Sequence, residues 1–143
     1  MRALALLMFL STPAFGWEAS SDGRICRLDH STPEVEVALT YDPAVPIYAI
    51  TLTRPGQVWP NGDVFVIAYA GAAPLTISTN RHMTDGSSPT VSDSGFGNVL
   101  NGLAFNTTAT ALLGSVAIPI DLSGARPEVE AFVDCTRTPS AGV

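Results

Sequence analysis

Four polar residues lie close together in the segment LTISTNRHMTDGSS, residues 75–88. They are Asn80, Arg81, His82 and Asp85. Arginine offers a planar fork of donors that fits carboxylates and phosphates, and histidine can change its charge near neutral pH. The spacing supplies no nucleophile, so the segment indicates binding of a small anion or a protein partner. The alternative is that these residues decorate a hairpin tip, because Asp-Gly followed by serines and proline is typical turn chemistry.

A catalytic serine would need His30 or His82 to activate it, because these are the only histidines in the chain. A serine hydrolase could assemble around either one, since such groups come together from distant parts of a chain. The sequence has no G-x-S-x-G and no H-E-x-x-H motif, and without lysine it has no P-loop. Two cysteines and two scattered histidines make no zinc pattern. We therefore expect no catalytic residue, no metal and no cofactor.

Residues 1–16, MRALALLMFLSTPAFG, have the three parts of a secretory signal. Arg2 precedes an apolar run that ends at Leu10, and small residues occupy positions 14 and 16. The run is shorter than the roughly 18–20 residues that span a bilayer. The sequence predicts a signal peptide cleaved between Gly16 and Trp17, and a periplasmic or secreted protein.

Cys26 and Cys135 are the two cysteines of the chain. In an exported protein, two cysteines and no others predict one structural disulfide. A redox pair is the alternative, but its cysteines usually stand close in sequence. The bond would close a loop of about 110 residues, for which the chain-entropy model gives roughly 4–5 kcal/mol.

The charge balance limits the classes of partner. The chain has 7 basic and 13 acidic residues, and every basic residue is arginine. Nucleic acids and anionic membranes attract concentrated positive charge, which this composition lacks. We expect no nucleic-acid partner and no membrane span in residues 17–143, which have the length of one domain.

Alternating apolar and polar residues predict β-strands through the middle of the chain. The residues expected on the inner face of segments 34–42 and 47–54 are Val35, Val37, Leu39, Tyr41, Tyr48, Ile50 and Leu52. Segment 63–71 is apolar on both faces, as a central strand would be. Segments 75–80 and 89–93 read as further strands, and two more flank a break near Gly114. We expect a mainly β fold with an antiparallel sheet or sandwich.

Two short helices are expected in the C-terminal third, at about residues 96–104 and 126–134. Apolar residues recur there at helical spacing: Phe96, Val99, Leu100 and Leu103 in the first, and Val129, Phe132 and Val133 in the second. Ser94 suits the N-cap of the first helix, and Pro127 suits the first turn of the second. Cys135 would fasten the second helix to the strand GRICRLDH, with residues 136–143 as a frayed tail.

Several stretches carry a resemblance: TYDPAVPIYAITLTRPG, PLTISTNRH, GFGNVLNGLAFNTTATALLG and a closing F-x-x-C. With these, nearly all of residues 17–143 resembles a group of small exported proteins from alphaproteobacteria. The group implies no activity and no catalytic residues. Some members are named as a component of excinuclease ABC, a name that implies ATP-driven DNA repair. The missing P-loop lysine, the acidic charge and the export signal speak against that activity.

These observations favour a periplasmic or secreted binding or interaction module, with Asn80, Arg81, His82 and Asp85 as the candidate binding residues. Its partner would be an unknown envelope protein or a small ligand. The first alternative is a structural or accessory envelope protein without a ligand. The second, and least favoured, is a small hydrolase using His82 or His30.

Overall fold

The computed structural model describes residues 16–85 and 88–137 of the chain. The predicted signal peptide, apart from Gly16, lies outside the described residues, as do residues 138–143 of the predicted tail. None of the helices described is long and apolar enough to cross a membrane.

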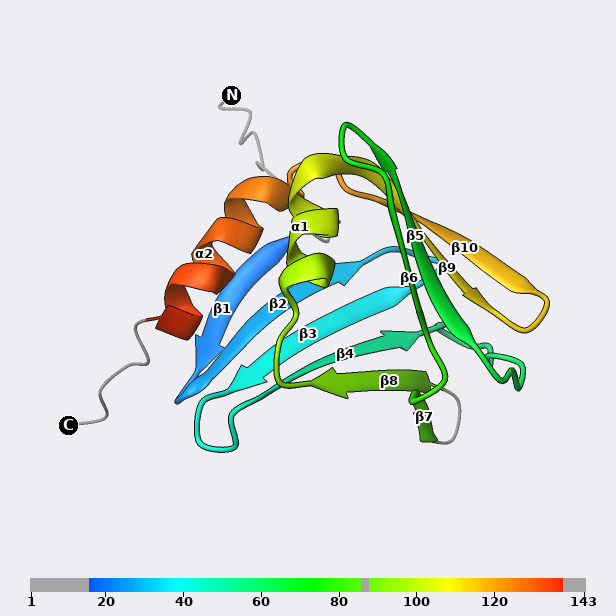
Figure 1. Ribbon diagram of the computed structural model, residues 1–143, viewed down its shortest axis with the longest axis horizontal. Coiled ribbons are helices and arrows are strands. Elements are labelled where there is room, and N and C mark those ends of the chain that lie inside the picture. Colours follow the sequence, from blue (N-terminus) through cyan, green and yellow to red (C-terminus); the bar gives the residue numbers. More distant parts are fainter. Residues whose placement is uncertain (1–15, 86–87, 138–143) are drawn as a thin grey trace, which may run out of the picture.

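Two antiparallel sheets form most of the protein (Figure 1). The six-stranded sheet has the order β1-β2-β3-β4-β8-β7. Its strands are β1 (Glu18–Asp22), β2 (Ile25–Ser31), β3 (Glu36–Asp42), β4 (Ile47–Thr53), β7 (Met83–Asp85) and β8 (Ser88–Asp93). The four-stranded sheet has the order β10-β9-β5-β6. Its strands are β5 (Phe65–Gly71), β6 (Leu75–Thr79), β9 (Asn106–Leu113) and β10 (Val116–Asp121). The expected mainly β antiparallel fold is confirmed.

The predicted alternation sets the register of the six-stranded sheet. Val37 of β3 lies opposite Leu52 of β4, and Leu39 lies opposite Ile50. All four side chains are buried, so the apolar face of both strands points into the core as expected. A slip of one residue would turn this face to solvent, which fixes the pairing. The strand β1 was not predicted, because its sequence EASSD has no apolar alternation and is almost wholly exposed.

Both predicted helices are present, as α1 (Gly97–Phe105) and α2 (Ala125–Arg137). They lie against each other, with α1 over β5, β6 and β9, and α2 over β1 and β2 (Figure 1). The predicted N-cap is wrong. Phe96 occupies that position without a side-chain cap, and the Ser94 hydroxyl donates to its neighbour Asp93 instead. The helix α2 also continues through Thr136 and Arg137, which the sequence pattern assigns to the tail.

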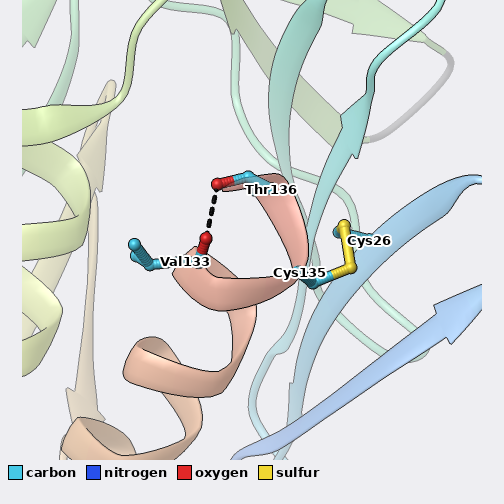
Figure 2. The surroundings of a disulfide bond; sticks show 4 residues. All are labelled: Cys26, Val133, Cys135 and Thr136. Atoms are coloured by element: carbon cyan, nitrogen blue, oxygen red, sulfur yellow. Dashed lines mark hydrogen bonds between the residues drawn. A yellow bond between two sulfur atoms is a disulfide. The ribbon is translucent and has the colours of Figure 1, made fainter. Parts of the chain in front are cut away.

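The predicted disulfide is confirmed. Cys26 of β2 is bonded to Cys135 in the last turn of α2, with their Cα atoms 5.9 Å apart (Figure 2). In the same turn the Thr136 hydroxyl donates a hydrogen bond of 2.7 Å to the carbonyl of Val133. The disulfide therefore fixes the carboxyl end of α2 to the second strand of the sheet.

The two sheets meet along two junctions that differ. At the first junction, between β1 and β10, Nε1 of Trp17 donates a hydrogen bond of 3.0 Å to the carbonyl of Asp121. At the second junction, between β6 and β8, a hollow separates the strands. We call these the closed junction and the open junction.

Candidate ligand-binding pocket

The chain crosses from one sheet to the other where the candidate residues stand, since β6 ends at Thr79 and β7 begins at Met83. Asn80, Arg81 and His82 form this crossing, and the Arg81 amide donates to the Thr79 hydroxyl at 3.0 Å. The hairpin lies farther along, between β7 and β8, where Asp85 pairs with Ser88. Only Asp85 of the four residues therefore belongs to the hairpin.

His82 turns toward the loop that precedes β5. Its Nε2 lies 2.9 Å from the carbonyl oxygen of Gly62, and its ring centroid lies 6.2 Å from that of Phe65. A carbonyl accepts, so Nε2 carries the proton in this contact. The side chain is half-buried and its Nδ1 has no hydrogen-bond partner within the described part of the chain. His82 thus fastens the crossing to the loop and does not line the hollow beside Arg81.

Arg81 differs from most arginines of the protein in having no internal partner. Four arginine side chains have partners within the protein. Three form ion pairs, Arg24 with Asp42, Arg27 with Asp29 and Arg126 with Glu130, and Arg54 donates a hydrogen bond to the carbonyl of Val58. Within residues 16–85 and 88–137, Arg81 and Arg137 make no side-chain hydrogen bond or ion pair. Arg137 ends α2, whereas Arg81 lines the hollow at the open junction.

That hollow is a pocket of about 530 Å³ between β6, β8 and the start of α1. Its apolar lining consists of Ile77, Val91, Phe96 and Val99. Phe96 and Val99 belong to the buried core, so the floor of the pocket is fixed by packing. Its polar lining includes Ser78, Thr79, Arg81, Ser92, Asp93 and Asn98. The pocket combines an apolar floor with an unpaired guanidinium.

The first turn of α1 borders the same pocket. It contains no acidic residue, and Phe96 gives it no side-chain cap. The first amide groups of a helix have no carbonyl partner within it and carry partial positive charge. Asp93 is the acidic residue in the lining, and its Oδ1 already accepts from the amide of Ser94 at 2.7 Å. The polar side of the pocket therefore favours a negative group near Arg81.

The other histidine lies at the closed junction. His30 is 7% exposed and stacks on Trp17, with ring centroids 4.4 Å apart and ring planes 3° from parallel. Burial lowers the pKa of its imidazole, while the backbone of Gly16 and the carboxylate of Asp121 partly oppose that effect. Throughout the described residues, neither histidine hydrogen-bonds to a hydroxyl or a carboxylate. The arrangement thus offers no base paired with a nucleophile.

Residues 16–85 and 88–137 contain no group of three His, Cys, Asp or Glu side chains placed to hold a metal ion.

The sequence identified Arg81 but missed its neighbours in the pocket, Asp93, Phe96 and Asn98. One usable signal was present in GFGNV, where the expected helix begins without an acidic residue in its first turn. The missing side-chain cap was not visible in the sequence, because Ser94 was expected to supply it. What no periodicity reveals is that β8 and β6, in different sheets, face each other across the pocket. Comparison with family models, curated proteins and solved structures finds no match to this chain.

Proposed function

We propose that the protein is an exported binding protein that holds a small amphipathic anion in the pocket at the open junction. The observation that carries the proposal is Arg81, an unpaired guanidinium on the rim of a pocket with an apolar floor. A carboxylate or phosphate group would pair with Arg81, and the apolar part of the ligand would cover Phe96 and its neighbours.

Size and polarity agree with this assignment. Pockets for small ligands usually measure about 300–1,000 Å³ and combine apolar walls with a few placed polar groups. A volume of about 530 Å³ falls inside that range. Because no nucleophile and base are paired among the described residues nearby, the proposed role is binding without chemistry.

The compartment is inferred from two observations that agree. Residues 1–16 have the pattern of a secretory signal, and the chain has a disulfide. Disulfides persist in the periplasm and outside the cell and are rare in the cytosol. A ligand of the envelope or of the surrounding medium is therefore expected.

The test uses matched pairs of small molecules that differ only in charge. Medium-chain and aromatic carboxylates would be compared with their neutral amides by amide chemical-shift changes in residues 17–143. We expect carboxylates to shift residues of β6, β8 and α1, and Arg81→Gln to weaken their binding about 10- to 100-fold, as for a lost hydrogen-bonded charge.

Arg137→Gln is the control, because it removes the other unpaired arginine of the described residues, far along the chain, and should leave binding unchanged. Equal binding of acid and amide, or equal affinity in Arg81→Gln, would count against the proposal. If none of the anions binds, the structural or accessory role becomes the better explanation.

A further inference from the structure

A buried aromatic pair marks the start of the folded chain. Trp17 is 6% exposed, its indole stacks on His30, and its Nε1 donates to the carbonyl of Asp121. These contacts hold the residue in front of β1 against both β2 and the end of β10. Trp17 is also the residue that the sequence places first after signal cleavage.

His30 lacks polar partners in this position. Its Nδ1 and Nε2 are both buried, and neither meets the distance and angle of a hydrogen bond within the described residues. Burial lowers the imidazole pKa, and the Gly16 backbone comes close enough to oppose that shift, but it does not complete such a bond. Buried polar atoms of this kind are rare, because each forgoes its bonds to water. The backbone of Gly16 lies near enough to influence the imidazole, so the unmet nitrogens lie close to the predicted cleavage point.

Carboxylates surround the same place. A hollow of about 380 Å³ is lined by Gly16 and His30 together with Glu18, Asp29 and Glu36. Arg27 also lines it but is engaged with Asp29 at 3.1 Å. The hollow therefore carries an excess of negative charge beside a histidine that lacks a donor.

We propose that this hollow is the binding site for the protein's own α-amino group, which cleavage between Gly16 and Trp17 creates. Hydrolysis breaks the Gly16–Trp17 peptide bond. The oxygen of water bonds to the Gly16 carbonyl carbon, which becomes a carboxylate, and the two protons of water end on the Trp17 nitrogen, which becomes an ammonium at neutral pH. This nitrogen is bonded to the Gly16 carbonyl carbon, about 1.3 Å away, so it already lies where the Gly16 backbone meets His30.

The new group supplies what the hollow lacks. An ammonium has three donors where the peptide nitrogen had one, and it adds a positive charge. In the proposed site one donor would bond to the imidazole of His30, and the charge would lie in the hollow that Glu18 and Glu36 line. The buried indole of Trp17 holds the nitrogen in place, so cleavage would strengthen the closed junction. This inference rests on the predicted cleavage and is independent of the pocket beside Arg81.

The experiment compares two proteins that differ by one residue. One begins at Trp17, released from a removable fusion, and the other begins at Gly16. We expect the protein that begins at Trp17 to unfold at a temperature about 3–6 °C higher, the shift that one net hydrogen bond of ordinary strength gives in a domain of this size. In His30→Phe this difference should vanish, whereas the matched variant His82→Phe should preserve it.

A second measurement covers the case in which His30→Phe fails to fold. The pKa of His30, followed by NMR in the two forms without substitutions, should be lower in the protein that begins at Trp17, because an adjacent ammonium disfavours imidazolium. The proposal would be overturned if the two proteins unfolded at the same temperature or if His30 had the same pKa in both. A difference in unfolding temperature that persists in His30→Phe would also overturn it. A periplasmic protein whose mass shows a start other than Trp17 would overturn it as well.

Discussion

The bond between Cys26 and Cys135 joins positions 109 residues apart, and its removal allows a quantitative prediction. For a loop of that length the chain-entropy model gives about 4.8 kcal/mol at 25 °C. We expect the variant Cys26→Ala with Cys135→Ala to lose about 3–5 kcal/mol of unfolding free energy. Its far-UV spectrum should stay mainly β, because Phe132 and Val129 still bury α2 against the sheet.

Urea unfolding, followed by tryptophan fluorescence, measures this loss, since Trp17 and Trp59 are both buried and report on different parts of the fold. The denaturant slope should increase, because the unfolded chain without the cross-link exposes more surface. Reduction of the wild-type protein should lower its urea midpoint to that of the variant. Reductant should leave the urea midpoint of the variant unchanged. A loss under about 1 kcal/mol, well below the range for native disulfides, would refute the entropy argument.

Two further predictions concern the histidines. Stability should fall as the pH drops below 6.5, the ordinary pKa of histidine, because the folded state holds His30 at a lowered pKa and binds fewer protons than the unfolded chain. Urea midpoints from pH 8 to pH 5 measure this fall, and a His30→Phe profile as steep as wild type would contradict it. His82→Ala should cost about 1–2 kcal/mol by removing its bond to Gly62 and its contact with Phe65, while Arg81→Ala should stay within about 0.5 kcal/mol. Thermal unfolding measures the stability loss of each variant. A larger loss in Arg81→Ala than in His82→Ala would contradict the structural role assigned to His82 and the binding role assigned to Arg81.

Local sequence patterns were sufficient to predict the strands and helices that bury one face in the core. The alternation in 34–42 and 47–54 predicted which side of β3 and β4 points inward, and the spacing of Val129 and Phe132 predicted the buried face of α2. The strand β1 was missed because its contacts are made by backbone and by distant residues, with little apolar content of its own.

The candidate site was only partly accessible to sequence reasoning. Arg81 and His82 are adjacent, and their types alone suggested a shared role. In the structure one side chain lines the pocket and the other bonds to the Gly62 carbonyl, which lies 20 residues earlier. The pocket itself depends on β8 pairing with β4 while β6 pairs with β5, and such pairings follow from the whole topology.

The placement of α2 over β1 and β2 has a consequence for how the protein comes to be folded. The strand β1 and the residue before it contact late parts of the chain. The Trp17 indole donates to the Asp121 carbonyl, and the Ala19 amide donates to the Glu128 carboxylate. A chain that emerges amino end first cannot make these contacts until its final segment has arrived. The inner face of β2 therefore stays exposed to solvent until the C-terminal segment is available. Contacts between segments so distant in sequence also form slowly. A chain that stops short of Asp121 would keep that face open and become a substrate for proteases.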